Sequence, residues 1–213
     1  MEVIDLSHKI CAQMPVYPGT ESPIIKQSNS LEKDGFIEKT ILMSYHTGTH
    51  IDSPSHILSN GKSLDLFDVK YFVGKGVVLD LREIKSSIIN IYNLLPFEKI
   101  IASVDFLLLN LGWSRFWGRH EYFARYPVLS IEAAEWLTKN FNLRGLGIDA
   151  ISVDQEGSNT FPVHRKLFKK EIIVIENLTN LEQLGNSTFL FSCLPLKIER
   201  ADGSPIRAVA FLD

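Results

Sequence analysis

Short runs of apolar and β-branched residues recur along the chain, and polar stretches that contain glycine or proline separate them. Runs of this length and composition are typical of strands that are buried in a sheet. Strands are therefore predicted at residues 37–45, 76–81, 105–111, 145–148, 171–175, 189–198 (with an interruption near Pro195) and 208–212. The pattern predicts a protein rich in β-structure.

Only one segment shows a clear helical spacing of its apolar residues. From Ala133 to Phe141 these residues recur at intervals of three or four, and Ser130 stands where an N-cap is expected. A helix is therefore predicted from the residue after Ser130 to residue 140. Residues 85–95 and 181–184 are weaker helical candidates. The mixture of strands and helices predicts α/β or α+β layering, and periodicity alone does not choose between them.

The composition predicts a single folded domain that does not bind nucleic acid. The chain has 213 residues, of which 45% are hydrophobic and 22% are charged, which is ordinary globular usage. No repeat or low-complexity linker divides it, so a single domain over residues 1–213 is predicted. The formal charge of -3 and the scattered lysines and arginines offer no basic surface, so nucleic acid is not an expected partner.

The same survey predicts a cytoplasmic protein without a membrane partner. No apolar run approaches the roughly 18 residues of a membrane span, and the sequence after Met1 lacks the basic and apolar regions of a signal peptide. Cys11 and Cys193 are too few for a disulfide framework and are interpreted as free thiols.

Three of the six histidines, His46, His50 and His56, lie close together in the sequence with Asp52. A regular strand would hold His46 and Asp52 roughly 20 Å apart, because each residue adds about 3.3 Å. Glycine, proline and β-branched residues in the segment disfavour a helix. The segment is therefore predicted to bend at Gly48 and to gather its imidazole and carboxylate groups in a loop.

This set of side chains is typical of a site for a divalent metal ion. Imidazole nitrogens and carboxylate oxygens suit Zn²⁺, Mn²⁺ or Fe²⁺. The alternative is a polar loop with ordinary hydrogen bonds. It is disfavoured because crowded histidines repel one another when protonated and lose hydration when neutral. Since a bound cation lowers the pKa of water from about 15.7 towards 7, the pattern predicts hydrolysis of an amide or ester.

The motif H-x-G-T-H-x-D-x-P-x-H, matched from His46 to His56, resembles the signature of the cyclase-like metal-dependent hydrolase family, which includes bacterial kynurenine formamidases. The similarity extends over nearly the whole chain, through residues 15–19, 112–113, 147–154, 163–164, 175–178 and 201–207. It implies a single compact α/β domain with a mixed, β-rich core flanked by helices, of the swivelling β/β/α type. It also implies a homodimer or higher homo-oligomer.

The resemblance also implies a ligand set. His46, His50 and Asp52 would bind one metal ion, and Asp52 would bridge to a second ion bound by His164 and Glu176. Two Zn²⁺ ions per subunit are expected, with Mn²⁺ as an alternative. Considered alone, His164 would be interpreted as a surface histidine and Glu176 as a salt-bridge or capping residue.

Two further residues receive roles from the resemblance. His56 is expected to donate and accept the catalytic proton, with the alternatives of a fifth ligand or a support for the ligands. Tyr17 occupies a place where formamidases usually carry tryptophan, and it is predicted to contact the substrate. The alternative for Tyr17 is a turn residue that packs beside the following proline and glycine.

The expected function is hydrolysis of a small amide, in particular an aryl formamide such as N-formylkynurenine. Hydrolysis of a cyclic amide, imide or lactone, or dehydration of a sugar, would use the same metal-binding residues and differ in the pocket lining. A metal-binding protein without catalytic activity is the alternative from another class.

Overall fold

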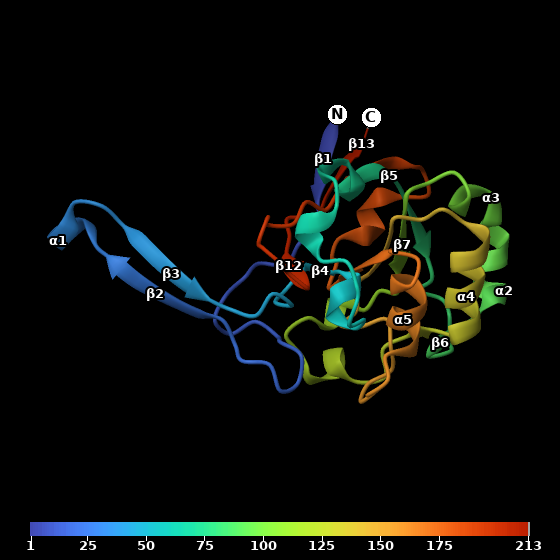
Figure 1. Ribbon diagram of the computed structural model, residues 1–213, viewed down its shortest axis with the longest axis horizontal. Helices are drawn as coiled ribbons and strands as arrows, with labels where there is room; N and C mark the ends of the chain where they lie inside the picture. The colour runs from blue at the N-terminus through green and yellow to red at the C-terminus, as the bar shows by residue number, and fades with distance from the viewer. Residues whose placement is uncertain (213) are drawn as a thin grey trace.

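Nine strands form one mixed sheet through the centre of the protein, in the order β1-β13-β11-β5-β7-β9-β10-β4-β12 (Figure 1). The computed structural model describes residues 1–212. The strands of this sheet are β1 (Glu2–Asp5), β4 (His50–Asp52), β5 (Val73–Asp80), β7 (Phe106–Asn110), β9 (Gly145–Ile148), β10 (Ile173–Glu176), β11 (Phe189–Ser192), β12 (Gly203–Pro205) and β13 (Val209–Leu212). The four central strands β5, β7, β9 and β10 are parallel, and the other neighbours pair antiparallel.

Helices lie together beside this sheet (Figure 1). They are α2 (Ile91–Leu94), α3 (Glu98–Ile101), α4 (Ile131–Asn140) and α5 (Pro162–Phe168). A small parallel pair, β6 (Ile88–Ile89) with β8 (Val128–Leu129), accompanies them. The predicted α/β fold with a mixed, β-rich core and flanking helices is confirmed.

The central strand β7 shows why its sequence is apolar throughout. Leu107 and Leu109 belong to the core on the helical side of the sheet, whereas Phe106 and Leu108 belong to the core on the other side. Successive strand residues point to opposite faces, so a strand covered on both faces needs apolar residues at every position. Burying each of these side chains contributes about 1.5–3 kcal/mol.

The helix predicted after Ser130 is confirmed as α4, and the Ser130 side chain accepts a hydrogen bond from the Ala133 backbone N–H at 3.0 Å. The weaker candidate at 85–95 was wrong in its first half. There Ile88 and Ile89 pair with β8, and the Asn90 capping box starts α2 only after them. The candidate at 181–184 is a single 3₁₀ turn, Leu181–Leu184.

One part of the chain stands apart from the sheet. Strands β2 (Ile24–Asn29) and β3 (Glu38–Leu42) form a hairpin whose tip carries the one-turn helix α1 (Leu31–Asp34). This segment, residues 24–42, is called the arm; it projects from the body of the protein (Figure 1). The strand predicted near residues 37–45 is therefore real, but it lies outside the core. None of the helices within residues 1–212 is long and apolar enough to cross a membrane.

Candidate metal centre

Strand register brings three of the predicted ligands together. In β4, His50 and Asp52 are two positions apart and therefore point to the same face of the sheet. The antiparallel register of β10 on β4 sets Glu176 directly opposite His50. One ligand atom from each of these three buried residues can be chosen so that all lie within 4.8 Å of one another. Backbone pairing of β10 with β4 thus brings Glu176 beside His50 and Asp52, although it lies more than 120 positions away in the sequence.

The bend predicted at Gly48 is present and sets the orientation of His50. Gly48 has φ of +68°, a conformation that favours glycine. Its carbonyl oxygen accepts hydrogen bonds from His50 Nδ1 and from the Asn177 side-chain amide, each at 2.8 Å. Because a carbonyl oxygen only accepts, His50 carries its proton on Nδ1. The Nε2 lone pair therefore faces Asp52 and Glu176, at 3.2 and 3.6 Å.

Helix α5 delivers His164 to the same place, and Asp154 fixes its orientation. The buried Asp154 carboxylate accepts hydrogen bonds from the backbone N–H groups of Val163 and His164 and, at 2.7 Å, from His164 Nδ1. His164 Nε2 consequently points at Asp52 Oδ2 and Glu176 Oε1, at 3.5 and 3.4 Å. This nitrogen is buried and makes no hydrogen bond. A buried nitrogen lone pair aimed at two carboxylates requires a cation or a proton.

The spacing of these atoms fits a divalent metal ion. Ligands at 2.0–2.2 Å around a tetrahedral ion lie about 3.3–3.6 Å from one another. The separations of the two Nε2 atoms from the carboxylate oxygens of Asp52 and Glu176 are 3.2–3.6 Å. Hydrogen bonds would bring the same atoms closer, to about 2.7–2.9 Å. The donor set and the partnerless nitrogen therefore suit a divalent cation.

His46 and His56 form a second group of side chains around Asp202. His46 lies between two carboxylates, with Nδ1 at 2.6 Å from Asp52 Oδ1 and Nε2 at 2.9 Å from Asp202 Oδ2. His56 Nδ1 lies 3.2 Å from the same Asp202 oxygen. Gly203 permits this approach, because a Cβ at that position would lie 2.5 Å from the His46 ring. Candidate ligand atoms of His46, Asp52 and His56 also lie within 4.8 Å of one another.

The pKa values of His46 and His56 are shifted in opposite directions. Burial by itself would lower the pKa of His46, but Asp52 and Asp202 outweigh it and raise this pKa to about 10. Burial lowers the pKa of His56, the neighbouring His46 and His164 act in the same direction, and Asp52 and Asp202 offset these effects only in part. The histidines around Asp52 also hold the pKa of its carboxyl well below the usual range, although burial opposes this. Asp52 is therefore an anion that attracts positive charge.

A cavity of about 220 Å³ opens over these groups. Its walls include Pro15, Val16, Ile151 and Phe161, while the histidines and carboxylates line its floor. Tyr17 also lines the cavity and is 36% exposed. The volume lies below the roughly 300–1,000 Å³ that is usual for drug-sized ligands, so the cavity suits a small molecule with an apolar part.

All seven residues predicted for the site lie around this one cavity: Tyr17, His46, His50, Asp52, His56, His164 and Glu176. Their grouping differs from the expected division, since His50 clusters with Glu176, and His46 clusters with His56. Sequence reasoning missed Asp154, Asp202 and Asn177, which orient the histidines. All three stand in segments that carry the family resemblance, 147–154, 201–207 and 175–178, but nothing local in the sequence connects any of them to a histidine.

Comparisons with known proteins agree with this site. The Cyclase family matches residues 4–155. An uncharacterized protein of Methanocaldococcus jannaschii is 36% identical over 215 residues, and the match covers all of both chains. The kynurenine formamidase of Bacillus cereus is 32% identical over 210 residues, which cover 98% of this chain and 96% of the relative.

A solved structure extends the likeness to three dimensions. Isatin hydrolase A from Ralstonia solanacearum superposes with a TM-score of 0.89 at 25% identity, and the match covers 100% of this chain and 92% of that one. The matched family, the curated relatives, the shared fold and the cluster of histidines and carboxylates lead to one assignment. The chain belongs to the cyclase-like family of metal-dependent hydrolases.

Proposed function

We propose that this protein hydrolyses the carbon–nitrogen bond of a small aryl amide, with an aryl formamide such as N-formylkynurenine as the leading substrate. The observation that carries the proposal is the convergence of the His50 and His164 lone pairs on Asp52 and Glu176 beneath a small cavity with apolar walls. The kynurenine formamidase relatives, which align over nearly the whole chain, support the substrate class.

The proposed ligands are His46, His50, Asp52, His164 and Glu176, with Asp52 shared between two ions. The resemblance places His50 with His46 at one ion, whereas the observed spacing sets His50 beside Glu176. Zn²⁺ is the proposed metal and Mn²⁺ the alternative, since mixed imidazole and carboxylate ligands accept both. When bound, such a cation polarises a carbonyl group and lowers the pKa of water.

His56 is the proposed proton carrier. A carboxylate only accepts hydrogen bonds, so His56 donates from Nδ1 to Asp202 and keeps a lone pair on Nε2. Because its pKa is lowered, His56 is neutral at pH 7 and can accept a proton from water. The resulting imidazolium can then return the proton to the departing nitrogen. Asp202 would orient the ring and stabilise its charged form.

Tyr17 and the apolar wall are proposed to bind the aryl part of the substrate. Aromatic rings stack favourably, and the Tyr17 ring is accessible from the cavity. A cyclic aryl amide is the second candidate, because isatin hydrolase A shares the fold over the whole chain. Both substrates place a carbonyl carbon beside an aryl nitrogen, so the same metal-binding residues would serve either reaction.

A metal-defined activity assay tests the proposal. Chelator-treated protein should be inactive, and added Zn²⁺ or Mn²⁺ should restore hydrolysis of N-formylkynurenine, with isatin and a simple lactone as comparison substrates. Tyr17→Ala should raise KM for the aryl substrate with little change in kcat. Tyr92→Ala, at an 81% exposed residue that does not line the cavity, is the control. Metal-loaded protein that hydrolyses none of these compounds would instead indicate a metal-binding protein without catalytic activity.

A further inference from the structure

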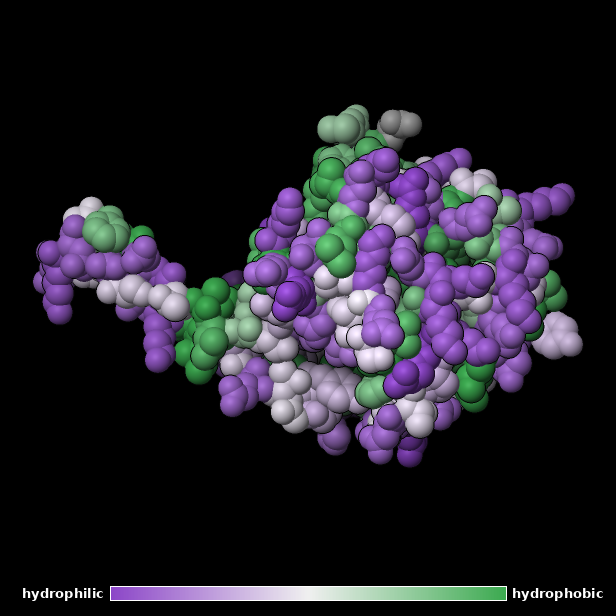
Figure 2. All heavy atoms as spheres, viewed as in Figure 1, coloured by the Kyte–Doolittle hydropathy of each residue, from purple (hydrophilic) through white to green (hydrophobic). Residues whose placement is uncertain are grey.

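Tyr122 is a fully buried tyrosine that lies close to the metal centre without lining the cavity. Figure 2 shows mainly hydrophilic residues on the visible face of the body, where polar groups can meet water. Tyr122 has no such access, because it is 0% exposed. A buried tyrosine hydroxyl needs a partner within the protein. That partner is Asn177, whose Oδ1 accepts a hydrogen bond from the Tyr122 hydroxyl at 2.6 Å.

Asn177 connects the two halves of the metal centre. It follows Glu176 directly, is 3% exposed and has a positive φ of +58°. Its backbone oxygen accepts a hydrogen bond from Thr49 Oγ1 at 2.6 Å, and its side-chain amide donates to the Gly48 carbonyl oxygen at 2.8 Å. The same carbonyl oxygen accepts the hydrogen bond from His50 Nδ1. Asn177 therefore ties the turn after one proposed ligand to the bend before another.

The amide of Asn177 is consistent with only one orientation. An amide turned by 180° would set Oδ1 against the Gly48 carbonyl oxygen, and two acceptors at 2.8 Å repel each other. In the observed orientation the NH₂ group faces that oxygen, and Oδ1 is left to accept from Tyr122. Burial raises the pKa of Tyr122 well above its usual value of 10, so at neutral pH the hydroxyl keeps the proton that it donates.

The Tyr122 ring is held from several sides, so its hydroxyl has a defined position. The rings of Trp117 and Phe123 meet it edge to face, with centroids 5.0 and 5.8 Å away. Its backbone carbonyl oxygen accepts a hydrogen bond from Trp113 Nε1 at 3.0 Å. Close-packed interiors leave a buried ring little freedom to move. A hydroxyl fixed in this way can fix the group to which it donates.

From these contacts we infer that Tyr122 is a positioning residue for the metal centre, because its hydroxyl fixes the Asn177 amide. The amide in turn fixes the Gly48 carbonyl oxygen, which holds the Nδ1 proton of His50. The Nε2 lone pair of His50 is thereby kept aimed at the two neighbouring carboxylates. The inference rests on the proposed role of His50 as a metal ligand, and it does not depend on which amide is the substrate.

Tyr122→Phe tests the inference, because it removes the hydroxyl and keeps the ring. Asn177 Oδ1 then loses its donor, and a buried polar group without a partner is costly enough to shift the amide. Losing a group that orients a metal-binding histidine weakens metal binding about 10- to 100-fold. Tyr122 acts through Asn177, so the Zn²⁺ dissociation constant should rise about 10-fold, at the lower end of that range. Competition with a chromophoric chelator measures it.

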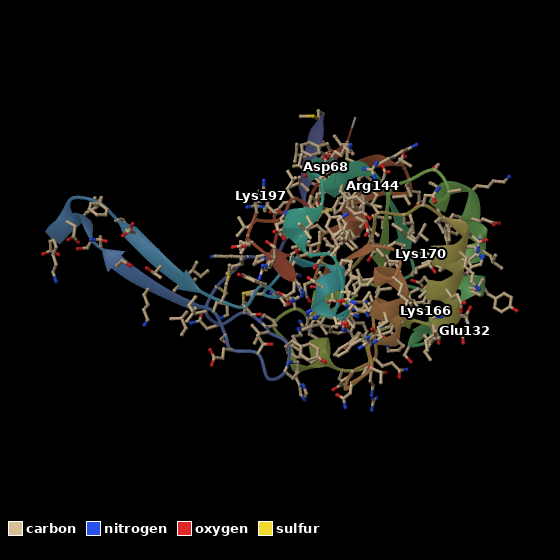
Figure 3. The ribbon with its side chains drawn as sticks, viewed as in Figure 1. Asp68, Glu132, Arg144, Lys166, Lys170 and Lys197 are labelled. Carbon is tan, nitrogen blue, oxygen red and sulfur yellow. The ribbon has the colours of Figure 1, made fainter. Side chains whose placement is uncertain are left out.

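Tyr71→Phe is the matched control, because it removes the same kind of hydrogen bond elsewhere. The Tyr71 hydroxyl donates to the Glu171 carbonyl oxygen at 2.8 Å. Tyr71 belongs to the 3₁₀ turn that begins after Asp68, which Figure 3 labels. Tyr71→Phe should lower the free energy of unfolding in urea and leave Zn²⁺ affinity unchanged.

A double-mutant cycle separates positioning from a purely structural role. Asn177→Gly removes the amide, and glycine accepts the positive φ of +58° at this position. Because Tyr122 acts through that amide, Tyr122→Phe should weaken Zn²⁺ binding by less than about 2-fold when residue 177 is already glycine. A loss as large as in the single variant would show that the hydroxyl acts by another route and would overturn the inference.

The Nδ1 proton of His50 provides a second measurement. Its exchange with water, followed by NMR in the Zn²⁺-loaded protein, should be about 10-fold faster in Tyr122→Phe than in the wild-type protein, because its acceptor is held less firmly. Tyr71→Phe should leave it unchanged. Wild-type Zn²⁺ affinity or unchanged exchange of this proton in folded Tyr122→Phe would overturn the inference. A Zn²⁺-loaded protein inactive on every aryl amide would refute the proposed function and leave these results as they stand.

Discussion

Replacing Asp154 with asparagine tests whether the orientation of His164 controls metal affinity. The Asp154 carboxylate accepts three hydrogen bonds at 2.7–3.1 Å, and one of them holds His164 Nδ1. Asparagine has nearly the same shape, but it keeps only one oxygen and is uncharged. Either orientation of the amide sets an NH₂ group against at least one N–H donor. The Nδ1 proton of His164 is then held less firmly, or not at all.

The structure gives the size of the expected effect. Leaving a buried donor without an acceptor costs about 1–3 kcal/mol of folding free energy. Losing a partner that orients a metal-binding histidine typically weakens metal binding about 10- to 100-fold. That change corresponds to about 1.4–2.8 kcal/mol of binding free energy. Asp154→Asn should therefore lower both stability and Zn²⁺ affinity.

Asp149→Asn is the matched control. Asp149 is also buried, and its carboxylate accepts hydrogen bonds from the backbone N–H groups of Leu111, Trp113 and Ser114, but from no histidine. Asp149→Asn should lower the free energy of unfolding by about as much as Asp154→Asn does, and it should leave Zn²⁺ affinity unchanged. Urea unfolding of the metal-free proteins measures the first effect, and competition with a chromophoric chelator measures the second. Wild-type Zn²⁺ affinity in folded Asp154→Asn would refute the reasoning.

Three further predictions concern neighbouring groups. His56→Ala should retain the metal content found by elemental analysis but lose at least 100-fold in kcat; full activity of this metal-loaded variant would contradict its proton-carrying role. Gly203→Ala should displace the His46 ring, because its Cβ would lie 2.5 Å from it, and should lower metal content. Gly157→Ala should strain a backbone with φ of +72° but crowd no side chain, and it should leave metal content unchanged. In metal-free protein the pKa of His46 is raised from 6.5 to about 10, so the stabilisation from its protonated form is complete below pH 6.5 and is lost as the pH rises through 10. Urea unfolding should show this decline, and Asp202→Asn should reduce it; a flat profile would argue against the carboxylate contacts.

Much of the local structure could be predicted from the sequence because it depends on neighbouring residues. The apolar runs became β5, β7, β9 and β10, since an uninterrupted apolar strand is stable only when both its faces are covered. The capping serine and the helical spacing fixed α4 at its observed limits. Gly48 provided the bend because few other residues adopt its positive φ.

The residue pattern by itself therefore determined a mixture of strands and helices, the bend and the metal-binding chemistry of residues 46–56, and the choice of an α/β fold came from the family resemblance. The resemblance had named His164 and Glu176 as distant members of the site, but only the tertiary structure decided how they meet residues 46–56 and added Asp202. Glu176 meets His50 through strand register, and Asp202 reaches His46 and His56 across 156 and 146 positions of the chain. The sequence of residues 37–45 in the arm likewise predicts an ordinary strand, and only the structure shows that this strand lies outside the core. These outcomes depend on long-range pairing and packing of the whole chain, whereas propensity and periodicity report only local preferences.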